Sequence, residues 1–249
     1  MVSLKSPFFD GLVCCNYNIA VLCFAMEIRL DVLSRCRLFE GVEASQIKGM
    51  LDCMRAYHKI YPKNGMVLSA DEPATDIGIL LAGGVNIVRE DYWGNRAILS
   101  HTGPGELFGE SFLYAGFENL PVSVICTEES AILFLNCRKI ITTCSSSCAF
   151  HDRLIINMMG ILASKNVGLT KKIGHITRRT IRERVLSYLS DQAIQARSNT
   201  VEIPFDRQEL ADYLSVDRSA LSGELSKMQK DGLIRFTRNH FTLLNEEKN

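Results

Sequence analysis

The chain has 249 residues, 47% of them hydrophobic, so it exceeds one typical domain and can fill ordinary apolar cores. With 28 basic and 28 acidic residues, the formal net charge of +0 by itself indicates neither a nucleic acid nor an acidic partner. The charge is unevenly distributed, because 15 of the basic residues but only 11 of the acidic residues lie from Lys165 onward. The C-terminal part therefore carries the sign of charge expected of a domain that approaches phosphates.

Nine cysteines form an odd set without regular spacing, which favours a reducing cytoplasm over a secreted disulfide framework. Cys14, Cys15 and Cys23 lack the motif-like spacing of iron–sulfur ligands, so we expect buried or idle thiols and no metal site. The apolar stretch that ends at Met26 is too short to span a bilayer and is not followed by a convincing cleavage site. We interpret residues 1–26 as a dispensable N-terminal extension, with Met26 as an alternative start, and we expect no membrane contact.

Residues 27–145 are predicted to form one domain. Their first part, 27–54, has apolar residues at helical intervals. From Tyr61 onward, short apolar runs such as 77–81 and 131–135 alternate with closely spaced glycines and prolines. Many short strands separated by turn signals are typical of a β-sandwich or jelly-roll barrel.

A helical period returns over residues 146–177. Apolar residues there follow alternating steps of four and three, which is a heptad seam with one polar member. A single helix cannot bury such a seam, so we expect it to pair with the identical helix of a second subunit, with Asn166 fixing the register. The alternative is that the seam packs on the chain's own barrel. The predicted dimerisation residues are Ile155, Met159, Leu162, Asn166, Leu169 and Ile173.

Residues 178–249 fit a compact winged helix-turn-helix domain. Asp206 with Glu209 forms a capping-box-like start for a first helix. After a short turn, Asp217 can cap a second helix that runs to about Asp231. Two apolar runs follow immediately and are predicted to pair as a hairpin, or wing.

The second helix of this motif is the candidate reader of DNA. A helix in the major groove needs side chains in its first turns that reach base edges, and Arg218 can donate two bonds to a guanine. Lys227 sits where a phosphate would lie, and Arg238 at the tip of the wing is positioned to touch the phosphate backbone. The predicted DNA-binding residues are Arg218, Ser219, Ser222, Lys227, Arg207 and Arg238.

Three stretches resemble the cyclic-AMP receptor and fumarate-nitrate regulator (Crp/Fnr) family of bacterial transcription factors. They are GPGELFGE at 103–110, RQELADYL at 207–214 and DRSALS at 217–222, and the likeness covers nearly everything after Met26. The resemblance implies an α+β chain with an N-terminal cyclic-nucleotide-binding-like β jelly roll, a long central dimerisation helix and a C-terminal winged helix-turn-helix. It also implies a homodimer on a two-fold symmetric double-stranded DNA operator, with RNA polymerase as a further partner if the protein is an activator.

The resemblance further implies an effector pocket in the barrel, at Gly109, Glu110, Leu120 and Ser123. Members that bind cyclic nucleotides follow the Gly-Glu pair with an Arg-Ser pair that holds the cyclic phosphate, and Leu120 stands where that arginine would be. A buried phosphate would lack its charge-assisted partner, which argues against cyclic AMP. Gly109 and Glu110 also have an adequate interpretation as turn and rim residues. In the second helix Gly223 replaces an arginine of many relatives, so their operators do not transfer to this chain.

The predicted function is a ligand-gated, DNA-binding regulator. An effector in the barrel would change how the paired helices sit, and thereby the spacing of two reading heads. The sequence does not identify this effector. A redox variant would use thiol oxidation at Cys126, Cys137, Cys144 and Cys148, although unreactive cysteines are the simpler interpretation.

Two other classes of function are alternatives to the regulator. A cupin-like enzyme needs clustered histidines at a metal, but the five histidines are scattered without a His-x-His pair, so we expect no enzymatic activity. A regulatory module that acts through protein contacts alone would keep the helix-turn-helix without using it on DNA.

Overall fold

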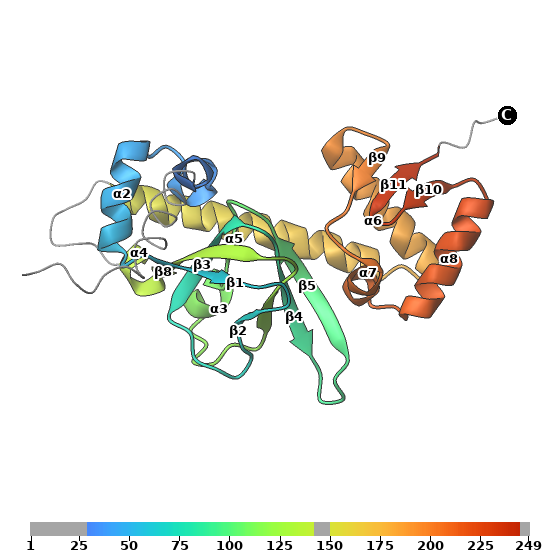
Figure 1. Ribbon diagram of the computed structural model, residues 1–249, viewed down its shortest axis with the longest axis horizontal. Helices are drawn as coiled ribbons and strands as arrows, with labels where there is room; N and C mark the ends of the chain where they lie inside the picture. Colours follow the sequence, from blue (N-terminus) through green and yellow to red (C-terminus); the bar gives the residue numbers. More distant parts are fainter. Residues whose placement is uncertain (1–28, 142–149, 245–249) are drawn as a thin grey trace, which may run out of the picture.

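The computed structural model describes residues 29–141 and 150–244, which form a barrel, one long helix and a C-terminal domain (Figure 1). The barrel and the C-terminal domain follow one another along the long helix. The expected extension 1–26, its cysteines, and Cys144 and Cys148 lie outside the described residues.

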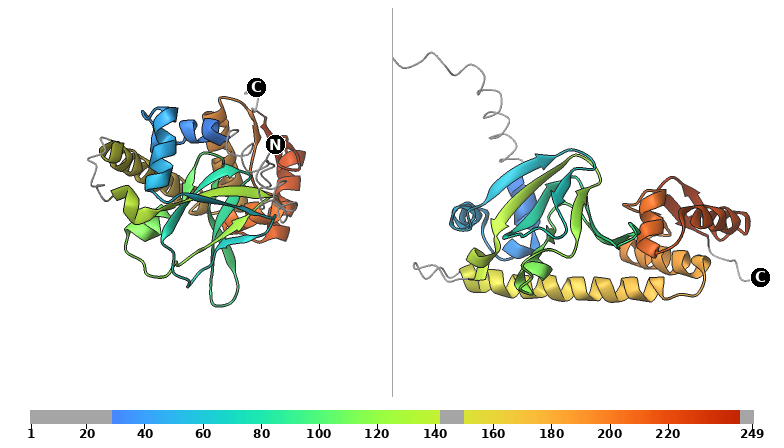
Figure 2. Two further views of the ribbon diagram at one scale, coloured as in Figure 1. Left: turned by 60° about the vertical axis from the view of Figure 1, so that its left-hand side comes forward. Right: turned by 90° about the horizontal axis from the view of Figure 1, so that it is seen from below.

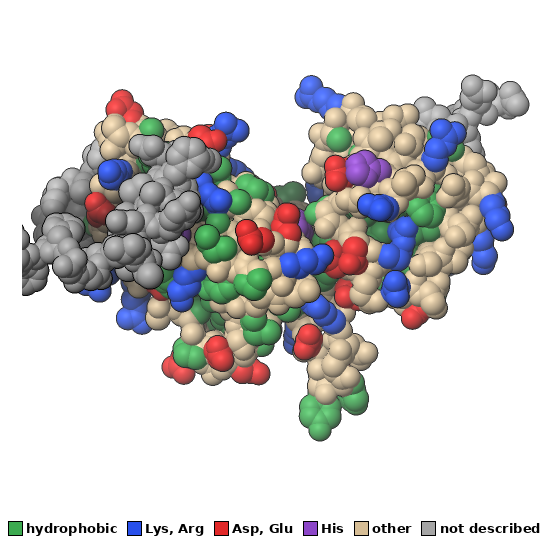
Figure 3. Space-filling model, viewed as in Figure 1, with side chains coloured by type: hydrophobic (Ala, Val, Ile, Leu, Met, Phe, Trp, Pro, Cys, Tyr) green, Lys and Arg blue, Asp and Glu red, His purple; other side chains and the backbone are tan. Residues whose placement is uncertain are grey.

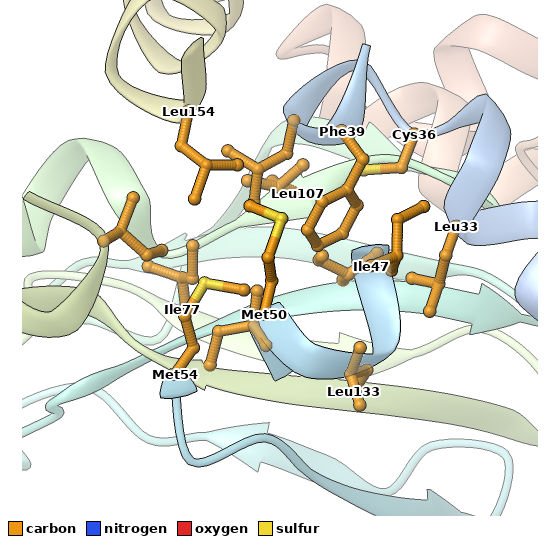
Figure 4. Close-up of a cluster of buried hydrophobic side chains, with 14 of the residues drawn as sticks. Leu33, Cys36, Phe39, Ile47, Met50, Met54, Ile77, Leu107, Leu133 and Leu154 are labelled. Atoms are coloured by element: carbon orange, nitrogen blue, oxygen red, sulfur yellow. The ribbon is translucent and has the colours of Figure 1, made fainter. Parts of the chain in front are cut away.

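Three short helical segments precede the barrel and pack on one end of it. Their bounds are residues 29–35, η1 (Arg37–Phe39) and α2 (Ala44–Cys53). Figure 4 shows Phe39 and Met50 of these segments beside Leu107 of the barrel and Leu154 of the long helix. One apolar cluster therefore joins the N-terminal segments, the barrel and the long helix.

The barrel consists of two antiparallel four-stranded sheets. The strands are β1 (Tyr57–Tyr61), β2 (Met66–Leu68), β3 (Asp76–Ala82), β4 (Val85–Glu90), β5 (Arg96–Thr102), β6 (Leu107–Phe108), β7 (Ser123–Cys126) and β8 (Ser130–Asn136). One sheet has the order β1-β8-β3-β6 and the other β2-β7-β4-β5. Leu80, Phe108 and Ile132 are fully buried in one apolar cluster that both sheets share. Two short helices, α3 (Glu110–Tyr114) and α4 (Cys137–Ile141), follow β6 and β8.

Gly78 on β3 allows an aromatic ring to lie across the strand. It pairs with Phe108 on β6, and a Cβ atom added at Gly78 would lie 2.1 Å from Cζ of Phe108. Any larger residue would push the ring out of the barrel interior, because packed cores have little free volume.

The long helix α5 (Phe150–Ile176) has 27 residues and forms one edge of the molecule (Figure 2). Leu154, Met158 and Ile161 on its inner face are buried in the same cluster as the barrel. The outer face points away from the barrel, so only one side of this helix is covered within the chain.

The C-terminal domain is a winged helix-turn-helix. Its elements are α6 (Ile181–Ala196), β9 (Thr200–Glu202), α7 (Arg207–Leu214), α8 (Arg218–Lys230), β10 (Ile234–Thr237) and β11 (His240–Leu243). As expected, Asp206 accepts a hydrogen bond from the Glu209 backbone N–H and Asp217 accepts one from that of Ala220. α8 ends just before Gly232, whose φ of +73° suits glycine. The predicted fold class, a jelly roll, a long helix and a winged helix-turn-helix, is confirmed.

A pair of glycine substitutions tests the packing of the barrel. Gly78→Ala should lower the free energy of unfolding by about 1 to 3 kcal/mol, because the added methyl group overlaps the Phe108 ring. Gly49→Ala, on α2 with no atom within 4 Å of its added Cβ, should raise that free energy by up to about 1 kcal/mol. Urea denaturation measures both, and a stable Gly78→Ala variant would contradict the close approach.

Candidate DNA-binding surface and effector cleft

Helix α8 is held by its apolar face and presents its polar face to solvent. Leu221, Leu225 and Met228 are fully buried in the core of the C-terminal domain. Arg218 and Lys227 are exposed, and because nine residues separate them they flank the polar face on its two sides. Figure 3 shows Lys and Arg side chains over the part of the surface that α8 and the wing form. The structure therefore leaves both predicted residues accessible to solvent.

Of the two predicted serines of α8, Ser219 uses its hydroxyl in a hydrogen bond at the start of the helix. The Ser219 hydroxyl donates to Asp217 Oδ1 at 2.5 Å, and this hydrogen bond lowers the pKa of the Asp217 carboxyl below its usual value. Ser222 is half-buried, and its carbonyl accepts a hydrogen bond from the Ser226 hydroxyl at 3.0 Å. In this conformation Ser219 supports the N-terminal cap of α8. Arg218 is therefore better placed than Ser219 to reach a base edge.

Two arginines of α6 fix α8 and the turn before it. Arg182 pairs through Nε with Glu224 at 2.6 Å and through a terminal nitrogen with Asp231 at 2.7 Å. Arg184 donates to the carbonyls of Leu214 and Ser215 at 3.1 and 2.9 Å. Neither arginine was predicted from the sequence, because their alternation with Glu183 at the start of α6 is at most a weak signal.

Arg207 and Arg238, also predicted to contact DNA, lie on a different part of the domain. The Arg207 guanidinium is half-buried over the rings of Phe236 and Phe241, 5.0 and 5.8 Å from their centroids. Arg238 is an exposed residue at the tip of the wing, with a φ of +55°. Both residues line a cleft of about 590 Å³ between the wing and the barrel loops that contain Lys63. Arg207 thus packs the wing against α7 rather than standing free at the surface.

The C-terminal domain is docked on the barrel through α7 and β5. Glu209 of α7 accepts a hydrogen bond from the buried Asn86 amide at 2.8 Å, and His101 Nδ1 lies 2.9 Å from Asn86 Oδ1. The His101 ring also meets Phe205 edge-on, with 5.9 Å between the ring centroids. Burial lowers the pKa of His101 and raises that of Glu209, because it disfavours the charged form of each group.

A cleft of about 660 Å³ lies between the barrel, α5 and the C-terminal domain. Glu110 of α3 is fully buried at its wall, and its Oε1 pairs with Lys165 Nζ at 2.6 Å. Lys165 also donates to the Leu107 carbonyl at 2.6 Å. The second carboxylate oxygen of Glu110, Oε2, is buried without a hydrogen-bond donor among the described residues. A bound molecule with a donor at this position would satisfy it.

Of the four predicted effector residues, two line this cleft. Gly109, with a φ of +88°, caps the N-terminus of α3 beside Glu110. Leu120 is buried outside the cleft lining, and the Ser123 hydroxyl accepts a hydrogen bond from the Ala70 backbone at 3.0 Å. The cleft is therefore built around the Gly-Glu pair and α5, not around the segment that contains Leu120.

The predicted seam of α5 is largely exposed. Met159, Leu169 and Ile173 are 67, 48 and 57% exposed, and Asn166 is exposed among them. Ile155 and Leu162, at the other end of the seam, are partly buried, and Leu162 touches the barrel cluster. The alternative, in which the seam packs on the chain's own barrel, applies only to the partly buried residues Ile155 and Leu162. The barrel mainly contacts the neighbouring face of α5, which carries Leu154, Met158 and Ile161.

Other expectations about sites concern metals, thiols and membranes. Across residues 29–141 and 150–244, no group of three or more His, Cys, Asp or Glu side chains is placed to hold a metal ion. Burial raises the pKa of the Cys126 thiol, which disfavours its reactive thiolate. Of the other redox candidates, the Cys137 side chain lies outside what is described. None of the helices within the described part of the chain is long and apolar enough to cross a membrane.

Substitution of the buried ion pair tests its geometry. Lys165→Met should lower the free energy of unfolding by about 3 kcal/mol at neutral pH, because it leaves the Glu110 carboxylate buried without a cation. The double variant Glu110→Gln with Lys165→Met should recover most of that loss, since neither charge then remains. A double-mutant cycle in urea measures the coupling, and additive effects of the two substitutions would argue against the pair.

Known protein families match both halves of the chain. The Crp-like helix-turn-helix domain matches residues 183–248, and the cyclic nucleotide-binding domain matches residues 58–147, which together make up more than half of the sequence. The CRP-like protein Clp of Xanthomonas euvesicatoria pv. vesicatoria (strain 85-10) is 22% identical over 184 residues, which cover 72% of this chain and 80% of that protein.

Solved structures share the fold of the chain. The c-di-GMP-responsive global regulator CLP of Xanthomonas campestris has a TM-score of 0.69 at 20% identity, covering 82% of this chain and 100% of that one. FixK2 from Bradyrhizobium japonicum has a TM-score of 0.63 at 18% identity, covering 78% of this chain and 94% of that one. With its cyclic nucleotide-binding domain, long helix and Crp-like helix-turn-helix, the chain belongs to the Crp/Fnr family of DNA-binding transcription regulators.

Proposed function

We propose that the chain is a homodimeric, ligand-gated regulator that inserts α8 of each subunit into the major groove of a two-fold symmetric operator. The observation that carries the proposal is the exposed Arg218 in the first turn of a helix whose apolar face is fully buried. An arginine there is suited to bidentate recognition of a guanine, and Lys227 further along is suited to a phosphate. Such a regulator would act in the cytoplasm, and as an activator it would contact RNA polymerase.

The second subunit is proposed to cover the exposed seam of α5. A row of large apolar side chains on one helix face is a typical interaction surface when it is left open to water. Met159, Leu169 and Ile173 follow the spacing at which two helices interlock, and Asn166 among them can fix their register. Pairing of the two α5 helices would hold the two copies of α8 at a set distance from each other.

Gating is proposed to act through the cleft between the two domains. Its lining includes Glu110 of the barrel side, Lys165 of α5, and Tyr213 of α7. A ligand there would favour one relative placement of the C-terminal domain over another, which is what a switch requires. The similar Xanthomonas campestris protein is described as responsive to c-di-GMP, which supports a small-molecule signal here. Because Leu120 replaces the phosphate-binding arginine, we do not propose cyclic AMP.

Alanine substitutions on α8 test the proposed contacts with DNA. Arg218→Ala should weaken binding to the operator by about 1 to 3 kcal/mol and relax the preference at one base pair. Lys227→Ala should weaken binding to operator and random DNA alike and reduce the salt dependence. Gel-shift titrations over a salt series separate these effects, with the exposed Lys48→Ala on α2 as a control for charge. Equal losses of Arg218→Ala on operator and random DNA would overturn its assignment.

A charge placed in the seam tests the proposed dimer. Ile173→Asp should convert the dimer into monomers, because two carboxylates would face each other in an apolar interface. Ile194→Asp, at a 74% exposed isoleucine of α6 outside the seam, should leave the dimer intact. Analytical ultracentrifugation gives the two masses, and a dimeric Ile173→Asp variant would place the interface elsewhere.

A further inference from the structure

Lys172 of α5 is a buried cation in the same cleft. The residue is 7% exposed, and its Nζ donates hydrogen bonds to the backbone carbonyls of Ile98 and Leu99. The third direction of the ammonium group is taken by the Tyr213 ring, whose centroid lies 4.6 Å from Nζ. These partners are two carbonyl dipoles and a ring, and none of them carries a full negative charge.

The burial of this charge has a measurable consequence for its ionisation. Desolvation lowers the pKa of Lys172 to about 8, since the described partners compensate only part of the lost hydration. Lys165, by contrast, is paired with a carboxylate in the same cleft. Among the described residues of the cleft, Lys165 therefore has a carboxylate partner, whereas no carboxylate is paired with Lys172.

The two lysines and the orphaned oxygen occupy two positions along the cleft. Lys165 and Lys172 both line it and are seven residues apart on α5, which is two turns or about 10 Å along the axis. Glu110, with its unsatisfied Oε2, lies beside Lys165, and we call this part the Glu110 end and the part at Lys172 the Lys172 end. The lining also includes the charged Arg37 and Glu106 and the apolar or aromatic residues Leu99, Phe112, Leu169, Phe205 and Tyr213.

We propose that this cleft binds an elongated, largely apolar ligand with an anionic group at the Lys172 end and a hydrogen-bond donor at the Glu110 end. The inference rests on the proposed ligand-gated function and names the chemical class of the ligand. The anion supplies the counter-ion that Lys172 lacks, and the donor satisfies Glu110 Oε2. The positive charge that the barrel lacks at Leu120 is thus provided by the central helix instead.

A ligand of this class would contact the reading head directly. Tyr213 belongs to α7, and Gln192 and Tyr188 of α6 also line the cleft. An anion that draws Lys172 Nζ away from the Ile98 and Leu99 carbonyls would loosen a link between α5 and strand β5. Ligand binding would then change how α7 rests on the barrel, and with it the position of α8.

The experiment compares two fluorescent probes of similar shape on the purified full-length dimer. The probe 8-anilinonaphthalene-1-sulfonate carries an anion and a donor N–H, whereas N-phenyl-1-naphthylamine lacks the sulfonate. We expect Lys172→Met to weaken binding of the anionic probe about tenfold, the loss of one charge-assisted contact, and to change binding of the neutral probe less than about twofold. Lys171→Met, at the exposed neighbour of Lys172, should change neither, and Lys172→Arg should retain the anionic probe.

Each outcome decides the proposal. Equal weakening of both probes by Lys172→Met would show that Lys172 only ties α5 to β5, and the proposal would be wrong. Anionic binding that is unaffected by Lys172→Met, or absent from the wild type, would also overturn it. If Lys172→Met does not fold, loss of the anionic probe by Lys172→Arg would count against the proposal. Operator binding is measured separately, so a dimer that selects the anionic probe but no DNA sequence refutes the proposed function and not the ligand class.

Discussion

The structure depends on a long helix that has apolar residues on two faces. Leu154 and Ile161 are covered by the barrel, whereas Met159 and Ile173 are exposed. A helix with two apolar faces needs two partners, and the chain supplies one of them. Because α5 is continuous over 27 residues, the barrel at one end and α6 at the other are fixed to the same rod. A second copy of the rod would set the geometry of the whole assembly.

The contact between the barrel and the C-terminal domain favours one relative placement of the two, because it contains polar as well as apolar groups. Asn86 is buried between His101 of the barrel and Glu209 of α7, and its hydrogen bond to Glu209 is lost if α7 shifts along β5. An unsatisfied buried polar group costs about 1 to 3 kcal/mol, so intermediate placements of the C-terminal domain are disfavoured. Around this network Ile98 of the barrel shares an apolar cluster with α7. The interface thus favours discrete arrangements of the reading head, as a switch needs.

Patterns within a few residues of sequence were enough to predict the helix caps and the apolar repeat of α5. The caps at Asp206 and Asp217 and the seam of α5 follow from spacings of three and four residues. The clamp from Arg182 to Glu224 could not be predicted, because 42 residues separate the partners and no pattern links them. The burial of Lys172 could not be predicted for the same reason, since its partners come from a distant strand and helix.

The surroundings of Arg207 are not visible in its motif. Its contact with DNA remains a prediction, and the sequence does not reveal that Phe236 and Phe241 of the wing lie under its guanidinium. The aromatic faces hold the cation by an interaction that depends on tertiary packing. Of the residues predicted for the effector pocket, Glu110 lines the cleft and Leu120 does not, because the cleft follows α5 rather than the order of residues in the barrel.

The composition of the first turns of α8 constrains how this protein can read sequence. Ser219 is bonded to Asp217, and Gly223 has no side chain and open space beside it. Glu224, which could accept from a cytosine, is held by Arg182. Among residues 218–224, Arg218 is therefore the long donor left exposed for base edges. In the proposed dimer, direct readout by one subunit would then be narrow, and selectivity would have to come from two symmetric half-sites, from phosphate contacts that fix the register, and from the shape of the DNA between them.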